Sequence, residues 1–277
     1  MNPFAAIGAF FNIFFLDPII NAMVLLIHGF NLVGIPGSLG LSIVALTIVI
    51  KLLTWPLMSA QLRSTRKMAE LKPHLDKLKE KHKNDQKAYN TAQMALMKEH
   101  GASPFAGCLP SLIQLPILIA LYQSIFVFFN SQSGLSHLNN LLYSFVSPLR
   151  KMPDSHFLGF NLANKPSEFG HYGILLLLIP VVTALLQFIQ SKMMSPNPVK
   201  EYPSDSPKEK KEKEVKEDAA GAMQSQMLYL MPLMIGFFSW QFPIGLALYW
   251  NTNTIFGIIQ QYKITGLGGL SVWIKKK

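Results

Sequence analysis

The chain has 277 residues, of which 50% are hydrophobic and only 14% are charged. Soluble domains carry roughly a quarter of charged residues, so this composition speaks against an ordinary soluble protein and favours a membrane protein. The net charge of +10 could indicate nucleic-acid binding, but no basic stripe carries interleaved aromatic residues, and no DNA partner is expected. The single cysteine, Cys108, excludes an intramolecular disulfide framework and a cysteine-only metal site.

The first 36 residues contain two apolar runs, Phe10–Phe15 and Ile19–Phe30, which Asp17-Pro18 divides. No Lys or Arg lies there to hold the N-terminus in the cytoplasm, and the positively charged start of a signal peptide is missing. We therefore expect residues 1–36 to form an extracytoplasmic helix that lies on the membrane surface. A further membrane span is the alternative.

Five later stretches are apolar enough to cross a membrane, whose hydrocarbon core of roughly 30 Å needs about 20 residues of helix. They predict an all-α membrane protein with five transmembrane helices at residues 41–58, 110–130, 172–190, 227–241 and 244–262. The fourth stretch is short, which implies local membrane thinning or burial among its neighbours.

The segments between the predicted spans differ sharply in charge. Of the 25 Lys and Arg residues, 10 lie in 59–103, 7 in 191–222 and 4 after Gln261, whereas the loop 131–170 has 3. Basic loops stay in the cytoplasm. The sequence therefore predicts a cytoplasmic C-terminal tail, 263–277, and an N-terminus and a 131–170 loop outside.

The two long cytoplasmic segments differ in kind. Residues 59–103 carry apolar stripes at helical spacing, which predict a charged helical hairpin; the alternative is a solvated linker. The stripes are Met68, Leu71, Leu75 and Leu78, then Tyr89, Ala92 and Leu96. Residues 191–222 contain four prolines, and their seven acidic residues balance their seven basic ones. Such a composition predicts disorder.

Lys51 lies within the first predicted span, where a charged side chain costs ~2.5–3.5 kcal/mol at the helix centre. No acidic residue in any of the five spans could neutralise it, so water or an anionic client is the expected partner. Thr47 lies one turn earlier on the same helical face. The plainer alternative is that the lysine reaches the inner headgroups with its long stem.

Other polar residues fall at a similar depth in the spans, from mid-membrane toward the cytoplasm. Hydrogen bonds between helices explain single cases, but a shared depth with a cation indicates a water-filled groove open to the cytoplasm and the inner leaflet. The candidate groove residues are Lys51, Thr47, Gln114, Gln187, Gln190, Trp250, Asn251 and Thr254.

Catalysis has little support in the sequence. There is no GxxxxGK[ST], HExxH or GxSxG motif, the histidines lack metal-ligand spacing, and the five spans hold no proton-relay residue. We therefore expect no enzyme, no cofactor and no metal. A channel or small-solute carrier using the same wet cavity is the alternative function, and an intramembrane hydrolase is a third.

Several motifs together resemble the YidC/Oxa/Alb family of membrane protein insertases. They run in order along nearly the whole chain: Ile48–Gln61, Pro104–Pro110, Leu112–Ile125, Phe188–Gln190 and Phe242–Gln261. The resemblance implies five helices around a hydrophilic groove that is open to the cytoplasm and lipid and closed on the outside. It also implies that the hairpin helps to recruit clients.

The resemblance also assigns roles to single residues. Lys51 matches a basic groove position that is usually Arg; lysine keeps the charge but loses the bidentate fork. Thr47 and Trp250 match groove positions, and Gln187 and Gln190 lie near others. The implied partners are nascent membrane proteins and membrane lipids, with the Sec translocon and the ribosome as candidates. No large periplasmic domain or lipoprotein signal is expected. The expected location is a bacterial plasma (inner) membrane, and an organelle membrane is the alternative.

Overall fold

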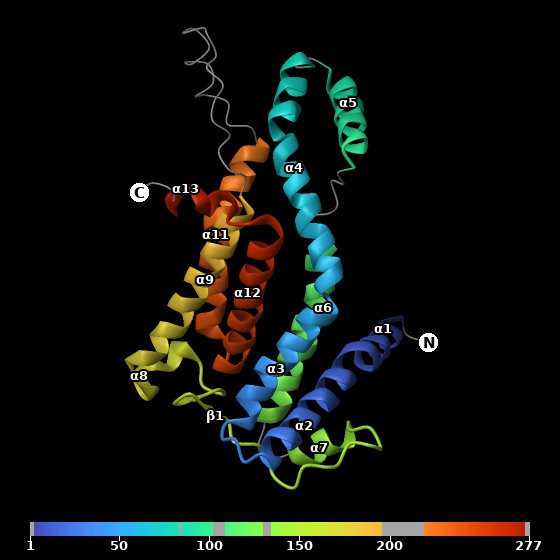
Figure 1. Cartoon of the computed structure of the whole chain (residues 1–277). Coiled ribbons are helices and arrows are strands. Elements are labelled where there is room, and N and C mark those ends of the chain that lie inside the picture. Colours follow the sequence, from blue (N-terminus) through green and yellow to red (C-terminus); the bar gives the residue numbers. More distant parts are fainter. Residues whose placement is uncertain (1–2, 83–84, 102–108, 130–133, 196–218, 275–277) are drawn as a thin grey trace. The chain divides into compact units, whose positions relative to one another are not determined.

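The computed structural model describes residues 3–82, 85–101, 109–129, 134–195 and 219–274, and these residues are mainly helical (Figure 1). They form two compact units. The first contains Met1–Trp55, Leu109–Thr183 and Gly236–Phe256, and the second contains Pro56–Cys108, Ala184–Ile235 and Gly257–Lys277. Most of the predicted disordered loop, 191–222, lies outside the described residues.

The first unit opens with a continuous helical run along the N-terminal residues. This run consists of α1 (Pro3–Phe11), a π-helical turn (Asn12–Leu16) and α2 (Asp17–Leu32). Within it, Ala5–Leu32 is long and apolar enough to cross a membrane, which is the alternative that the sequence left open for residues 1–36. The interfacial position of this helix stays a prediction.

The core of the first unit lies where α2 packs against α3 (Ser38–Leu53) and α6 (Leu109–Phe129), and the start of α12 (Ile244–Thr265) packs against the end of α6. Its buried side chains are apolar and include Met23, Val24, Ile27, Leu39, Ile43, Leu121, Ile125 and Ile244. Large apolar side chains elsewhere on the helices are exposed, as at Leu53 and Val181. This distribution fits helices whose outer surfaces face lipid.

Asn21 of α2 binds the segment that follows α6 through hydrogen bonds of its side chain. Its side chain donates to the carbonyl oxygens of Asp17 and Leu141, at 2.8 and 3.0 Å, and accepts from the backbone N–H of Tyr143 at 2.7 Å. The ring of His28, two turns further along α2, lies 2.8 Å from the carbonyl oxygen of Ser147. A buried amide with all of these bonds holds the short α7 (Gly134–Asn140) and the loop behind it in a fixed place.

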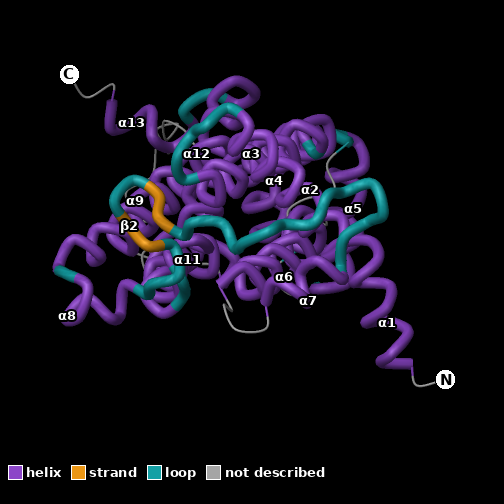
Figure 2. The backbone as a smooth tube through the Cα atoms, turned by 90° about the horizontal axis from the view of Figure 1, so that it is seen from below, coloured by secondary structure: helices purple, strands orange, loops and turns teal. Residues whose placement is uncertain are grey.

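A two-stranded antiparallel hairpin follows, made of β1 (His156–Phe157) and β2 (Phe160–Asn161), and Figure 2 shows it among the helices. Phe157 lies directly against Gly40 of α3, where a Cβ atom would overlap the aromatic ring. The chain then passes through α8 (Phe169–Tyr172) and two 3-10 turns (Pro166–Glu168 and Ile174–Leu177) into α9 (Leu178–Met194). Gly40 therefore sets the distance between α3 and the hairpin.

Two helical stretches of the described residues are long and apolar enough to cross a membrane, Ala5–Leu32 and Ile174–Met194. The pair Ser38–Leu53 and Trp55–Met68 adds a third if it counts as one broken span. The break falls at Thr54, inside the predicted span 41–58. Pro56 explains it, because proline has no N–H to donate to the carbonyl oxygen of Leu52 and its ring clashes with that carbonyl in a continuous helix, whereas proline is well suited to the first turn of a new helix.

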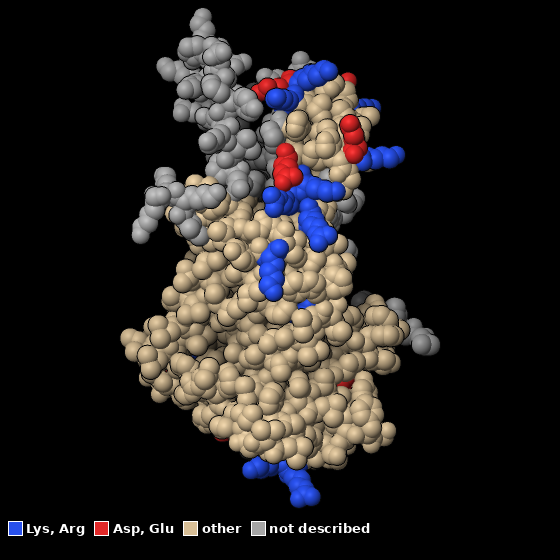
Figure 3. Space-filling view, in the orientation of Figure 1, with Lys and Arg blue, Asp and Glu red and all other residues tan. Residues whose placement is uncertain are grey.

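The second unit contains the hairpin of α4 (Trp55–Lys81) and α5 (Gln86–Glu99). Leu71 and Met97 are buried in it, and the two apolar stripes that the sequence predicts meet there through Met68, Leu75 and Leu96. Over the described residues, α4 and α5 therefore pack together along these stripes. Figure 3 shows several Lys and Arg side chains, and some acidic ones, on the part of the surface where this hairpin lies.

The remaining elements of the second unit are parts of α9, α11 (Ala219–Gln241) and α12, followed by a 3-10 turn (Gly268–Leu270) and α13 (Ser271–Ile274). α11 and α12 take the place of the predicted spans 227–241 and 244–262. The number of spans, five, stays a prediction.

We expect Gly40→Ala to destabilise the protein by about 1–3 kcal/mol, the usual cost of overpacking a filled site, because the new methyl group must displace Phe157. Thermal unfolding in detergent, followed by circular dichroism, measures the loss. Gly29→Ala is the matched control: it lies in a helix with nothing within 4 Å of the added carbon, so it should be neutral or stabilising. Equal stability of the two variants would contradict the close contact between Gly40 and Phe157.

Candidate functional site

The buried face of α3 carries polar side chains among its apolar ones. Ser42, Thr47 and Lys51 are all buried. The hydroxyl of Ser42 donates to the carbonyl oxygen of Ser38 at 2.7 Å, and that of Thr47 donates to the carbonyl oxygen of Ile43 at 2.6 Å. These bonds to the preceding turn satisfy the hydroxyl donors. Thr47 and Lys51 therefore share one face, as their spacing predicts.

Lys51 stands out because its side chain is only 8% exposed. Within the part of the chain that the structure describes, its ammonium group has no ion pair and no hydrogen bond to another side chain. A buried ammonium without a partner is very costly unless water or an anion reaches it. That Lys51 attracts a polar or anionic group from outside the chain stays a prediction.

The start of α12 supplies further polar groups to the same unit. Trp250 and Asn251 are half-buried, and Thr254 is buried. The Oδ1 atom of Asn251 is buried and has no hydrogen-bond partner among the described residues. Such an unsatisfied acceptor is unusual in a folded protein and marks a place for water or a ligand donor.

Gln114 of α6 has a more structural role than the sequence predicts. Its side-chain amide donates to the hydroxyl of Tyr249, which is buried on α12. The residue therefore joins two helices that are far apart in sequence, the usual use of an amide between membrane helices. Tyr249 was not among the predicted site residues, although it directly precedes Trp250 in the motif.

Gln187 and Gln190 of α9 belong to the second unit, whereas the other six predicted residues belong to the first. Gln190 lies against Gly257 of α12, where a Cβ atom would overlap its amide nitrogen. A glycine at this position thus leaves room for the Gln190 amide beside the helix backbone. That all eight residues line one groove stays a prediction.

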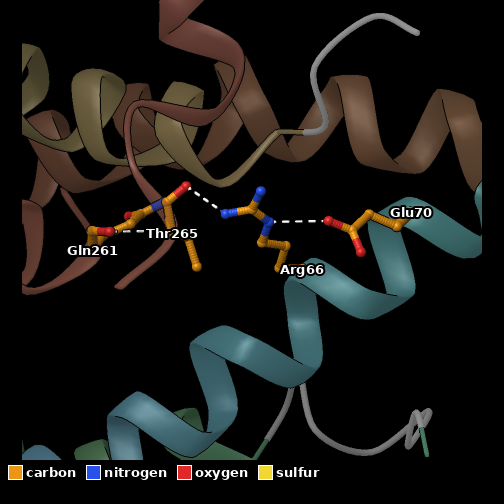
Figure 4. Close-up of polar contacts among 4 residues, drawn as sticks. All are labelled: Arg66, Glu70, Gln261 and Thr265. Atoms are coloured by element: carbon orange, nitrogen blue, oxygen red, sulfur yellow. Dashed lines mark hydrogen bonds and ion pairs between the residues drawn. The ribbon is translucent and has the colours of Figure 1, made fainter. Parts of the chain in front are cut away.

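A second group of polar residues, absent from the prediction, joins α4 to the C-terminal part of α12 within the second unit. Ser59 and Gln260 are both buried and lie 3.2 Å apart through Oγ and Nε2. Two turns along α4, Arg66 donates to the carbonyl oxygen of Thr265 at 2.9 Å and to Glu70 at 3.0 Å (Figure 4). Arg66 thus caps the carbonyl end of α12, where a cation is favourable.

Within the described residues, no group of three or more His, Cys, Asp or Glu side chains could hold a metal ion. The polar groups of the eight predicted site residues are one ammonium, several amides and hydroxyls, and one indole. They can bind and orient a polar segment by charge and hydrogen bonds.

The sequence is similar to a known family of membrane proteins and to several of its named members. Residues 31–267 match the model of the family described as the 60Kd inner membrane protein. The chain is 35% identical over 257 residues to "Membrane protein insertase YidC 1" of Halalkalibacterium halodurans, and the match covers 91% of this chain and 78% of that protein. It is 33% identical over 232 residues to "Membrane protein insertase YidC" of Fusobacterium nucleatum, with 84% and 88% covered.

A third relative is "Membrane protein insertase MisCA" of Bacillus subtilis, which is 34% identical over 231 residues, with 82% of this chain and 70% of that protein covered. Among solved structures, the fold is similar to "Active YidC insertase crystal structure with the first transmembrane domain resolved". The TM-score is 0.53 at 22% identity, and the match covers 89% of this chain and 46% of that one.

The fold and the apolar helices define a helical protein of the membrane-embedded class. The chain belongs to the 60Kd inner membrane protein family, which confirms the resemblance that its motifs indicate.

We expect Arg66→Gln to loosen the junction between α4 and α12, because it removes the cap on the Thr265 carbonyl. Hydrogen exchange of the last turn of α12, read by mass spectrometry in detergent, should speed up by about fivefold, since a typical hydrogen bond contributes about 1 kcal/mol.

Arg63→Gln is the matched control for this exchange measurement, because Arg63 has the same charge and is exposed on the same helix. It should leave exchange in α12 unchanged. Equal exchange in the two variants would show that the contact is not maintained in solution.

Proposed function

We propose that this chain is a membrane protein insertase, which helps the transmembrane helices of client proteins to enter and fold in the membrane. The observation that carries the proposal is Lys51, a buried cation on the polar face of α3 that has no ion pair with any residue that the structure describes. The names of the relatives support the same function. An insertase binds its client without making or breaking covalent bonds, which fits a site made of amides, hydroxyls and one ammonium.

The proposed topology has five spans, a cytoplasmic C-terminus and an extracytoplasmic N-terminus in a bacterial plasma membrane. Charge supports it, since the hairpin residues 59–103 hold 10 of the 25 basic residues and the 131–170 loop holds 3. In this topology Lys51 lies on the cytoplasmic half of its helix. The groove then opens to the cytoplasm and to the inner leaflet.

Insertion begins when a nascent apolar helix reaches the membrane near the charged hairpin α4–α5. The polar terminus of the client enters the groove, where Lys51 attracts its carboxylates or its carbonyl dipoles. This contact offsets part of the desolvation cost that a polar segment meets in the membrane. Asn251 adds an acceptor for a client N–H, because its buried Oδ1 atom has no partner within the described residues.

The driving force comes from the client itself. Its apolar segment gains ~25 cal/mol for each Å² of apolar surface that leaves water. The membrane potential adds ~2.3 kcal/mol per charge per 100 mV for a polar terminus that crosses it. The insertase therefore lowers a barrier and needs no nucleotide. The Sec translocon and the ribosome are proposed partners for longer clients.

We expect Lys51→Gln to slow the insertion of a single-span client with an acidic N-terminal segment by about tenfold, which corresponds to about 1.4 kcal/mol of lost attraction. Lys51→Arg should keep most of the activity because it keeps the charge. The measurement is protease protection of the client in liposomes that hold only this purified protein.

Two controls accompany the Lys51 variants. Lys151→Gln removes a charge of the same kind from an exposed loop and should leave insertion unchanged. A client with a neutral terminus should depend less on Lys51. Normal insertion of every client by Lys51→Gln would rule out the groove charge, and no protection beyond empty liposomes would rule out an autonomous insertase.

We also expect a photocrosslinking residue in place of Trp250 to capture a client during insertion, because Trp250 is half-buried beside the unsatisfied Asn251. The same residue in place of Val181, which is 62% exposed on α9, should capture mainly lipid. The products are separated by gel and identified by mass spectrometry. Capture of clients at Val181 alone would place their route outside the proposed groove.

A further inference from the structure

The chain after α12 folds back onto the end of α9. Gly266, at φ 75°, ends α12 in the left-handed conformation, and its N–H donates to the carbonyl oxygen of Tyr262 at 3.1 Å. The N–H of Gly269 then donates to the carbonyl oxygen of Ser195 at 3.0 Å. We call residues 266–274 the C-terminal clasp, since they bind the last turn of α9 through their backbone.

Two glycines make this approach possible. A Cβ atom on Gly268 would overlap the carbonyl group of Met193, and one on Gly269 would overlap the hydroxyl of Ser195. Gly268 also has φ 50°, which side chains disfavour. The backbone of the clasp therefore packs directly against the end of α9, and only glycine fits at positions 268 and 269.

The clasp brings its single tryptophan to a defined place. The ring of Trp273 lies 5.9 Å from that of Phe188, centre to centre, and the Nζ atom of Lys192 lies 5.2 Å over it. Phe188 also contacts Tyr229 of α11 at 6.0 Å. We call Phe188, Lys192, Tyr229 and Trp273 the aromatic–lysine cluster.

This cluster is open to its surroundings. Trp273 is 57% exposed and Tyr229 is 60% exposed, which is far more than aromatic side chains of a core show. Lys192 lies in the last turn of Ile174–Met194, a stretch able to cross a membrane. The cluster thus stands at the end of a span, where tryptophan, tyrosine and lysine meet lipid headgroups.

Among the described residues of α9, α11, α12 and the clasp, the charges have one sign. α9 contains no Asp or Glu, and neither does the sequence from Ala219 onward. Lys192 and Lys263 are the basic residues of these described elements, and Lys275, Lys276 and Lys277 follow the clasp in the sequence. The seven acidic residues of 191–222 lie outside the described residues. The described basic side chains therefore attract anions to this end of α9.

We propose that the aromatic–lysine cluster is a binding site for the headgroups of anionic phospholipids in the cytoplasmic leaflet, with Trp273 at headgroup depth and Lys192 on the phosphate. The side of the membrane rests on the topology given under the proposed function, whereas the lipid site itself does not require insertase activity. Basic residues next to a membrane span are attracted to an anionic membrane surface. RNA phosphates would suit the lysines, but exposed aromatic rings at the end of a span favour lipid.

The test uses fluorescence quenching by brominated lipids in vesicles of phosphatidylcholine and phosphatidylglycerol at four to one. In one set the bromine is on the anionic lipid, and in the other an equal amount is on the neutral lipid. The signal of Trp273 is the difference between the full chain and Trp273→Phe, which leaves Trp55, Trp240 and Trp250 in place. A variant with phenylalanine at those three positions checks the difference directly.

We expect the brominated anionic lipid to quench Trp273 about twice as strongly as the neutral one. Lys192→Gln should bring the two to parity, and Lys151→Gln, the matched charge control, should leave the difference intact. Equal quenching in the unchanged protein would overturn the headgroup selectivity. No quenching by either lipid, with a fluorescence change on adding an RNA oligonucleotide, would overturn the lipid site in favour of RNA.

Discussion

The cost of burying Lys51 is the constraint on which the rest of the site depends. A charged side chain on a helix that faces lipid is expensive, and Lys51 is buried on α3 without an internal counter-ion in the described chain. The hydroxyls of Ser42 and Thr47 donate to carbonyl oxygens of their own helix, and neither carries a charge that could balance the ammonium. In the proposed function, the balancing group belongs to the client or is water.

Polar groups that are paired within the chain have a structural role, because they hold two helices together. Gln114 bonds to Tyr249, and Thr183 of α9 lies 3.2 Å from Ser239 of α11 through their buried hydroxyls. Apolar surfaces alone give membrane helices little reason to choose one neighbour over another, because lipid is equally apolar. Each hydrogen-bonded pair thus fixes a contact between two helices. The side chains of such a pair are then less available to bind a client.

Local features of the fold could be predicted from the sequence, and contacts between distant segments could not. The shared face of Thr47 and Lys51 follows from helical spacing, and the contact of Leu71 with the stripe of α5 follows from two apolar stripes. The pairing of Gln114 with Tyr249 spans 135 residues, and no periodicity reveals it. The break at Thr54 is also a local feature, because Pro56 cannot donate to the carbonyl oxygen one turn before it, but the mainly apolar run 41–58 by itself predicts a single span.

An insertase has to release its client, and this requirement gives a reason for the uneven use of polar groups. An internal carboxylate beside Lys51 would neutralise it and leave less attraction for a client. A single ammonium and an unsatisfied amide oxygen on Asn251 offer instead a few contacts that water can replace, each of modest net strength. The apolar part of the client then decides the outcome, because only its transfer into lipid yields a free energy that grows with length.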